Sequence, residues 1–178
     1  KVVFQGTSPQ VVSGSAAITL GNANNVVNVG STLACGAVTG NFNVNGTLTV
    51  NGTLRIDQGG YPTGTGTIAY GANGTLAFNN SSGSYGVNND KYWPTSAGPV
   101  NVSVLGAGGI TLNVARTVAG TTTIASGSTF LANGVTYTAN GAVQVNGTFQ
   151  LGQGAWATGS GTWTYGSAGT LAFGNATG

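Results

Sequence analysis

The segment Asn51–Phe78, NGTLRIDQGGYPTGTGTIAYGANGTLAF, returns without a gap as Asn146–Phe173, NGTFQLGQGAWATGSGTWTYGSAGTLAF. The two copies are identical at 16 of 28 positions, and the differences are mild, as between Tyr61 and Trp156. An internal repeat built from short strand-like pieces is typical of proteins whose structural units stack on one another. The question is therefore less which active site the chain holds than what its stacked surface is for.

Short runs in which apolar and polar residues alternate predict half-buried strands along the whole chain. Examples are Thr47–Val50 (TLTV), Val100–Val104 (VNVSV) and Ala142–Val145 (AVQV). A period of two with β-branched residues indicates a strand with one buried face, and no helical periodicity is sustained. Asn-Gly dipeptides separate these runs, and because both residues tolerate a positive φ, we expect each dipeptide to mark a turn. They are Asn45-Gly46, Asn51-Gly52, Asn73-Gly74, Asn133-Gly134, Asn140-Gly141 and Asn146-Gly147.

Two all-β architectures fit this pattern, and we predict the first: a parallel β-helix (β-solenoid) of stacked short strands. The alternative is an antiparallel β-sandwich built from repeats. Asn45 and Asn51 open equivalent Asn-Gly-Thr-Leu pieces that are six residues apart. That spacing is too short for a hairpin whose two strands bury the same face, and it suits a coil that turns a corner at each Asn-Gly. Coils stacked about 4.8 Å apart would place Asn above Asn and Thr above Thr.

The phase of the repeat divides the chain into two unequal units. We expect a first, shorter solenoid unit at 1–77, a second at 78–172 and the start of a further unit at 173–178, in one continuous rod. Neither end resembles the polar cap that solenoids normally need over their end strands. We therefore expect either a longer array or end-to-end joining of identical chains. The candidate assembly ends are Lys1, Val2, Val3, Phe4, Leu171, Ala172 and Phe173.

One segment, Ser84–Pro94 (SYGVNNDKYWP), breaks the rhythm of strands and turns. It concentrates aromatic residues together with one acid and one base. We predict a longer loop or a lateral excursion from the coil at this place.

The composition argues against most enzymatic chemistry. The chain has four basic and two acidic residues and no histidine, and charged residues make up 3% of it, against about 25% in ordinary globular chains. Catalytic triads and metal sites that need histidine are thereby excluded, and a net charge of +2 on scattered residues does not suit nucleic acid. We expect no enzyme, no metal and no cofactor, and no run is apolar enough for membrane insertion.

The remaining reactive residue types also favour structural roles. A paired-carboxylate site needs two acids at a defined separation, but Asp57 and Asp90 lie in different parts of the repeat. We expect Asp57 to be a surface charge that pairs with nearby Arg55. Cys35 is the lone cysteine and stands in an apolar context, so we expect a small buried hydrophobe.

Several sequence motifs resemble those in the β-strand-repeat regions of large secreted bacterial surface proteins, many of them adhesin-like. Residues 1–14 (KVVFQGTSPQVVSG) are similar to the phrase that opens such repeats, and residues 92–104 (YWPTSAGPVNVSV) to an aromatic-proline phrase followed by a strand. Gly109–Asn113 with Arg116–Val118 resembles the strand pair that follows. Together with the two copies, the resemblance covers most of the chain. It implies an extended extracellular β-solenoid stalk or fibre and supplies no catalytic motif.

Aromatic residues are the best candidates for contact with a ligand. Exposed rings along a solenoid can stack on sugar rings, and the candidates for contact with a glycan or surface are Tyr61, Trp93, Trp156 and Trp163. The alternative is that these rings fill the core or cover a corner. Threonine-rich stretches such as Thr63–Thr67 raise ice binding as a lesser alternative, although that function needs a regular Thr-x-Thr on every coil and here the motif is sporadic.

We therefore expect a structural repeat module of an extracellular β-solenoid fibre or giant surface protein. Its end strands would join the next unit by β-strand augmentation, so its partners would be other copies of itself or adjoining repeats of one polypeptide. The alternative function is that of an adhesin that binds glycans or surfaces through exposed aromatic rings. Either role predicts a secreted protein at the cell surface or outside the cell.

Overall fold

The chain folds into stacked turns of parallel β-strands, a β-solenoid, as shown by a computed structural model that describes residues 1–38, 42–88 and 91–174. All described secondary structure is β, and the described strand pairs are parallel, in about eight turns counted over the whole chain. The predicted parallel β-helix is thus confirmed, and the antiparallel sandwich is wrong. The chain separates into two compact units, unit 1 (Lys1–Ala77 and Asp90–Val100) and unit 2 (Phe78–Asn89 and Asn101–Gly178). Of the predicted further unit at 173–178, residues 175–178 lie outside the described residues.

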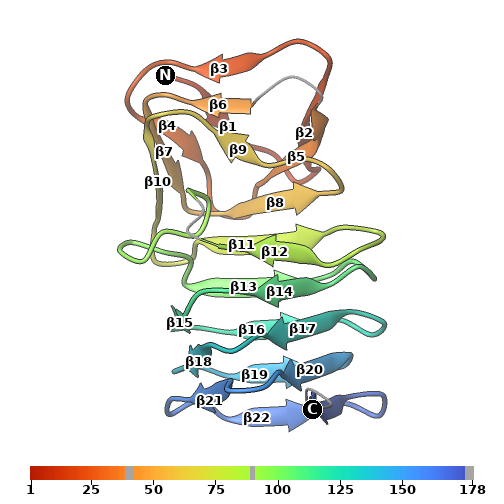
Figure 1. The fold of residues 1–178 in the computed structure, drawn as a ribbon. Helices are drawn as coiled ribbons and strands as arrows, with labels where there is room; N and C mark the ends of the chain where they lie inside the picture. Colours follow the sequence, from red (N-terminus) through yellow and green to blue (C-terminus); the bar gives the residue numbers. More distant parts are fainter. Residues whose placement is uncertain (39–41, 89–90, 175–178) are drawn as a thin grey trace. The chain divides into compact units, whose positions relative to one another are not determined.

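Unit 1 has three walls, each a ladder of parallel strands (Figure 1). Successive turns are 20 to 24 residues apart, since Thr47 pairs with Thr67 and Ile18 with Phe42. The first wall has the order β1-β4-β7-β10, the second contains β2-β5-β8, and the third is β3-β6-β9. The strands are β1 Val3–Phe4, β2 Gln10–Gly14, β3 Ile18–Leu20, β4 Asn25–Val27, β5 Thr32–Val38, β6 Phe42–Val44, β7 Thr47–Val50, β8 Thr53–Asp57, β9 Pro62–Thr63 and β10 Thr67–Tyr70. Strand β11, Thr75–Asn79, begins in unit 1 and ends in unit 2.

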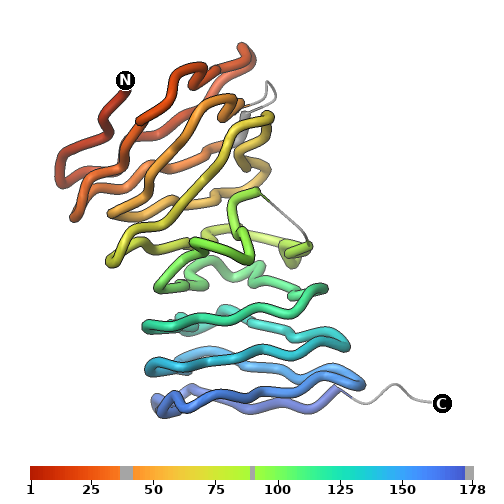
Figure 2. The backbone as a smooth tube through the Cα atoms, turned by 90° about the vertical axis from the view of Figure 1, so that its left-hand side faces the viewer, coloured from red at the N-terminus to blue at the C-terminus, as the bar shows by residue number. Residues whose placement is uncertain are grey.

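Unit 2 repeats the three-walled plan with successive turns one above another, from green to blue in Figure 2. Its ladders have the orders β13-β16-β19-β22, β12-β14-β17-β20-β23 and β15-β18-β21. The strands are β12 Tyr85–Val87, β13 Asn101–Val104, β14 Ile110–Leu112, β15 Arg116–Val118, β16 Thr122–Ile124, β17 Thr129–Ala132, β18 Thr136–Ala139, β19 Val143–Val145, β20 Thr148–Leu151, β21 Trp156–Thr158, β22 Trp163–Tyr165 and β23 Thr170–Phe173.

The core of each unit is a set of inward-facing columns of apolar side chains. In β7, Leu48 and Val50 are fully buried while Thr47 and Thr49 face outward, which is the alternation that the sequence predicts. Each fully buried aliphatic or aromatic side chain stabilises the fold by about 1.5–3 kcal/mol relative to exposure. Unit 2 adds an aromatic cluster in which the rings of Phe130, Tyr137 and Phe149 lie 4.8–5.9 Å apart, centre to centre.

The Asn-Gly corners fall between strands as predicted, but the reason for their glycines differs from the predicted one. Of the six glycines, only Gly134 has a positive φ, 67°. A Cβ on Gly46 would lie 1.9 Å from the carbonyl oxygen of Asn22, and one on Gly52 would lie 2.2 Å from that of Asn28. These positions need glycine because the backbone of the preceding coil passes directly against the corner.

Polar side chains on neighbouring turns make the expected cross-turn ladders in places. The hydroxyl groups of Thr138 and Thr158 lie 3.0 Å apart, and Asn133 Nδ2 lies 3.4 Å from Asn113 Oδ1. Such contacts link adjacent turns without any net charge.

Candidate binding and assembly surfaces

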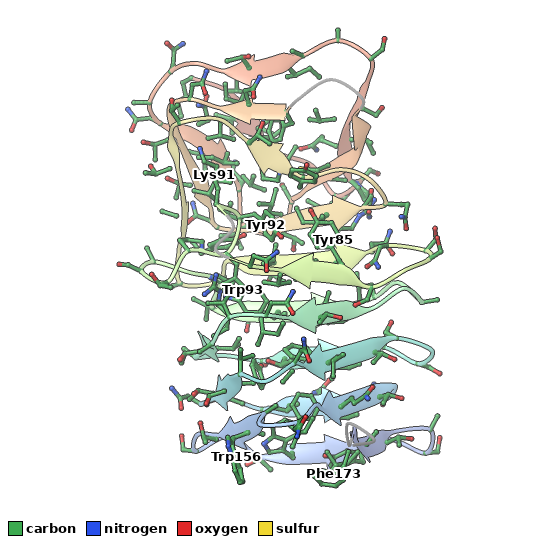
Figure 3. All side chains as sticks on the ribbon, in the orientation of Figure 1. Tyr85, Lys91, Tyr92, Trp93, Trp156 and Phe173 are labelled. Atoms are coloured by element: carbon green, nitrogen blue, oxygen red, sulfur yellow. The ribbon has the colours of Figure 1, made fainter. Side chains whose placement is uncertain are left out.

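Two of the four predicted contact rings face solvent, one in each unit. Tyr61 in unit 1 is 50% exposed and Trp156 in unit 2 is 68% exposed. Figure 3 labels Trp156 in the last turns of unit 2. The register pairs Trp156 with Thr136, which faces outward from β18, so the indole stands on the outer surface of its wall. These two residues occupy the same position in the two copies of the repeat.

Trp93 does not present its ring to solvent, which corrects its place among the contact candidates. It is 1% exposed, and the neighbouring Tyr92 is buried too. Both residues belong to unit 1, and the hydroxyl of buried Tyr70 donates a 2.6 Å hydrogen bond to the Tyr92 carbonyl oxygen. Burial raises the pKa of Tyr70 well above its ordinary value. The Ser84–Pro94 segment therefore supplies Trp93 to the core instead of to a binding surface.

Trp163 also belongs to the interior more than to the surface. It pairs in register with Val143, a fully buried residue, and is itself half-buried. Its ring packs edge-on against Phe149 with 4.7 Å between ring centres. The register thus places Trp163 on an inward-facing column, which favours the alternative that this ring fills the core.

A cavity of about 410 Å³ opens beside Trp156 in unit 2. Its walls come from the turn Gly152–Ala155, from Trp156 and from Phe173. Glycine backbone and two aromatic rings form a flat, largely apolar surface, with Gln153 as a polar group. An indole with its face open can stack on the apolar face of a sugar ring.

The last described turn of unit 2 carries exposed apolar residues on positions that face inward elsewhere. Phe173 pairs in register with Leu151, which in turn pairs with the buried Ala132, yet Phe173 is 71% exposed. The equivalent residue of the first copy, Phe78, is 0% exposed. Tyr165 and Leu171 are exposed in the same way, while their counterparts Tyr70 and Leu76 are buried.

The backbone of β23 points one set of its N–H and C=O groups toward the edge that faces away from β20. Thr170 donates to the Gly147 carbonyl oxygen and Gly174 to that of Leu151, so residues 170, 172 and 174 face β20. Because the main-chain groups of alternate residues point to opposite edges of a strand, those of Leu171 and Phe173 face away from β20. Ala172, between them, is half-buried.

The other candidate assembly end, in unit 1, is partly paired. Val26 donates to the Val2 carbonyl oxygen and Asn28 to that of Phe4, both at 3.0 Å, so β1 is held along β4. Val2 and Val3 remain exposed, as does Lys1, and Phe4 is half-buried.

Reactive groups in the described residues are tied into the fold. Arg55 and Asp57 form the expected pair, with Nε and Nη2 of the arginine 2.7 and 2.8 Å from the two carboxylate oxygens. This contact raises the pKa of Arg55. Cys35 is fully buried as predicted, and burial raises the pKa of its thiol to about 12, which keeps the sulfur protonated and unreactive. Asp90 lies outside the described residues.

Two further kinds of site are absent from residues 1–38, 42–88 and 91–174. These residues hold no group of three or more His, Cys, Asp and Glu side chains that could bind a metal ion. They also form no helix with the length and hydropathy to cross a membrane.

Within the described ranges of the chain, the outward-facing threonines form no regular two-column array. Thr47 and Thr49 of β7 are followed on the next turn by Thr67 and Ala69, and Thr121 and Thr123 are followed by Ala142 and Gln144. The Thr-x-Thr motif is therefore interrupted from one turn to the next, which is not the surface that ice binding needs.

Sequence reasoning missed two features. Lys91 extends its amine to the Val44 carbonyl oxygen at 3.0 Å and lines a groove along β10. Arg116 is buried, and its guanidinium donates to the carbonyl oxygens of Asn88 and Ala115 at 2.6 and 3.1 Å. The sequence has only four basic residues, and that scarcity is the signal that could have drawn attention to these two.

Comparison of the sequence with protein-family models and with curated proteins finds no match. No solved structure matches the chain either.

Proposed function

We propose that this chain is a structural module of an extracellular β-solenoid, stacked end to end with another rung of the same kind. The next rung comes from a second copy or from an adjoining repeat of one polypeptide. The single observation that carries the proposal is the contrast between Phe78 and Phe173, equivalent residues that are 0% and 71% exposed. Because the equivalent side chain is buried in the first copy of the repeat, we infer that a further turn covers Phe173 in the second copy.

The backbone supports the same proposal. The outward N–H and C=O groups of Leu171 and Phe173 are arranged to pair with a parallel strand, as β23 itself pairs with β20. β-Strand addition of this kind gains main-chain hydrogen bonds and buries the exposed column in one step. The mechanical result is a stiff rod whose strength comes from ladders and an apolar spine, with amides and hydroxyls on its surface.

A location outside the cell suits this surface. Neutral Asn, Thr and Ser side chains with 3% charged residues, together with the resemblance to secreted repeat regions, support the proposal of a cell-surface or secreted module. Fractionation of the source cells with an antibody to this chain tests it. Recovery in the cytoplasmic fraction alone would contradict it.

The test of stacking is the solution mass of the purified chain over a concentration series, together with negative-stain electron microscopy. We expect concentration-dependent assemblies or filaments for the wild-type chain. F173N should shift the assembly to monomers, because it removes apolar area from the contact. The matched control Y61N changes an exposed ring away from the end turn and should assemble like the wild type. A wild-type chain that stays monomeric up to millimolar concentration would overturn self-association.

A second candidate function, glycan binding, is favoured by one observation. The exposed rings Tyr61 and Trp156 occupy matched positions, and Trp156 lines a cavity. A rod that presents such rings at intervals suits multivalent contact with a glycan surface. A glycan array should then show binding that W156A and Y61A weaken and that W163F, a change at a half-buried ring, leaves intact. No binding by the wild type would contradict this function.

A further inference from the structure

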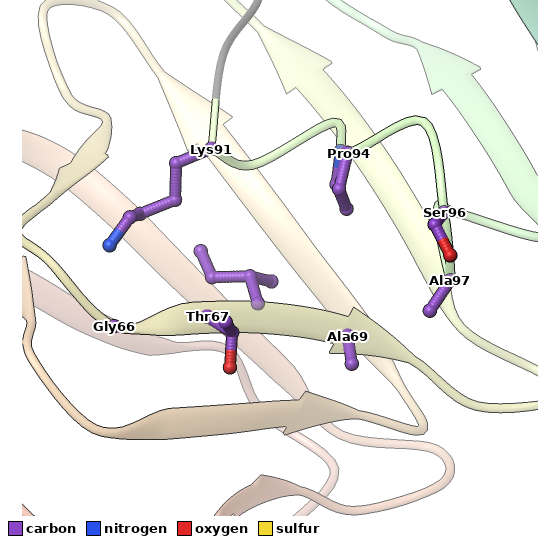
Figure 4. A pocket seen from close by; sticks show the side chains of 8 residues that line it. Gly66, Thr67, Ala69, Lys91, Pro94, Ser96 and Ala97 are labelled. Carbon is purple, nitrogen blue, oxygen red and sulfur yellow. The ribbon is translucent and has the colours of Figure 1, made fainter.

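A groove runs along the outer edge of β10 in unit 1 and has a volume of about 410 Å³ (Figure 4). Strand β10 is the last strand of its wall, so one of its edges has no neighbouring strand. Residues 66–69 form one side of the groove, and Lys91, Pro94, Ser96 and Ala97 form the other. The volume lies within the range of ligand pockets, about 300–1,000 Å³.

The edge of β10 that faces away from β7 offers backbone groups to the groove, although Ile68 as a whole is 4% exposed. Thr67 donates to the Gly46 carbonyl oxygen and Gly71 to that of Val50, so residues 67, 69 and 71 face β7. The backbone N–H of Tyr70 points the other way and donates to the Ala97 carbonyl oxygen at 2.9 Å. By this alternation the N–H and C=O of Ile68 also point away from β7, and in the described part of unit 1 they have no hydrogen-bond partner.

The groove is held open at both ends. At one end the Tyr70–Ala97 hydrogen bond joins the two sides, and at the other the Lys91 amine bonds to the Val44 carbonyl oxygen. Between these points lie Tyr92 and Trp93, which are both buried. The segment that borders the groove is therefore anchored by hydrogen bonds at Lys91 and Ala97. The position beside Ile68, where a further strand would lie, is left vacant.

The chemistry of the walls selects the occupant. An edge strand with free N–H and C=O groups recognises another extended backbone, because each group needs a main-chain partner. Pro94 and Ala97 line the groove, and we expect them to favour small side chains on that backbone. Lys91 uses one of its three donors on Val44, so its remaining donors and its charge favour a carboxylate.

Other occupants fit less well. A sugar ring needs an exposed aromatic face, and the nearest indole, Trp93, is buried. A second copy of this chain has two acids to offer, and Asp57 is already paired with Arg55. Burial lowers the pKa of Lys91, and a bound carboxylate would offset the cost of removing water from this amine.

We propose that this groove binds an extended peptide with small side chains and one acidic residue, which adds to β10 as a strand beside Ile68 and places its carboxylate at Lys91. The peptide belongs to another protein. This binding site is separate from the end turn of unit 2, so it does not depend on the stacking role.

The probe is a phage-displayed library of random linear heptapeptides, selected on the immobilised full chain. We expect enriched peptides to contain an Asp or Glu and to protect the Ile68 amide from hydrogen exchange, as measured by NMR. Without peptide, this amide should exchange much faster than that of Tyr70, which is already bonded. A synthetic copy of the best peptide with N-methylated alternate amides should no longer bind, because it cannot complete the ladder.

Variants separate the two parts of the recognition. K91Q should weaken the peptide about threefold to tenfold, as expected for a partly exposed ion pair, while K1Q, which removes the same charge outside the groove, should not. S96W should block the groove, and S15W is its matched control on an exposed loop. Thermal melts of S96W and S15W confirm that both are folded.

The results decide the proposal in either direction. The proposal is established if the selected peptides protect the Ile68 amide from exchange, fail to bind when their alternate amides are N-methylated, and do not bind the S96W chain. Failure to enrich any peptide over the S96W chain, or enrichment without protection of Ile68, would overturn it. Protection of Ile68 by cellohexaose instead would overturn it in favour of a glycan groove.

Discussion

The hydroxyl groups of Tyr137 and Thr122 hydrogen-bond to each other inside unit 2, where both residues are fully buried. Tyr137 lies on β18 and Thr122 on β16, so this bond crosses the interior from one wall to another. The threonine sits on a column whose other members are apolar, as its partner Val143 shows. Each hydroxyl thus satisfies the other in a place where neither could reach water.

This pair predicts strong non-additivity between two substitutions. Y137F should lower the free energy of unfolding by about 1–3 kcal/mol, because it leaves the Thr122 hydroxyl buried without a partner. T122V alone should cost a similar amount, whereas the double variant should be close to the wild type. Urea unfolding of the four proteins measures this cycle. Additive losses would show that the two hydroxyls act independently.

The buried Cys35 thiol and Tyr137 phenol predict that the free energy of unfolding falls at alkaline pH. The thiol pKa of Cys35 rises from 9.0 to about 12 in the fold, and that of the Tyr137 phenol from 10.0 to about 12. Above pH 9 the unfolded chain releases the thiol proton while the folded chain retains it, so stability is complete below pH 9 and falls as the pH rises toward 12. Each such group contributes a slope of about 1.4 kcal/mol per pH unit between its two pKa values.

The variant C35A isolates the first part of this fall. Between pH 9 and 10 its free energy of unfolding should stay level, while that of the wild type declines; above pH 10 both should decline through the tyrosines. Chemical denaturation at half-unit steps of pH gives the comparison. A wild-type curve that is flat up to pH 10 would contradict a buried, protonated Cys35.

The fold class could be predicted because its signals are local. The alternation in Thr47–Val50 shows which side chains face inward, and the six-residue spacing of Asn45 and Asn51 argues against a hairpin. The structure confirms both inferences. The reason for glycine at these corners could not be predicted, because the contact of Gly46 is with Asn22, a residue 24 positions earlier on the preceding turn.

The surfaces were harder to predict than the fold. The internal repeat suggested Tyr61 and Trp156 as a matched pair of rings, and both are exposed. Trp93 has no counterpart in the second copy, so nothing in the pattern showed whether its segment turns inward or outward. The free edge at Ile68 also depends on where residues 91–97 rejoin the ladder, which is a property of the tertiary structure.

Close approach of stacked turns predicts that G52A is destabilising. A Cβ at position 52 would lie 2.2 Å from the Asn28 carbonyl oxygen and 2.3 Å from that of Ser31, so the turns must separate. We expect a loss of about 2–3 kcal/mol in the free energy of unfolding, as for other overpacked sites. G21A is the matched control, since no atom lies within 4 Å of its added Cβ, and it should change stability by about 0.5 kcal/mol or less. Equal melting temperatures for the two variants would refute close stacking at this corner.

The opposite environments of two tryptophans predict opposite results for the same substitution. W93A removes a ring that is 1% exposed and should cost about 3–5 kcal/mol, because it leaves a large cavity at a buried position. W156A removes a ring that is 68% exposed and should change stability by no more than about 0.5 kcal/mol. Guanidinium unfolding gives the free energies, and fluorescence gives an independent readout: iodide should quench the signal of Trp156 and leave that of Trp93 unchanged. If W93A proved as stable as the wild type, the segment after residue 90 would not be anchored by its rings, and the groove along β10 would lose the wall that holds it open.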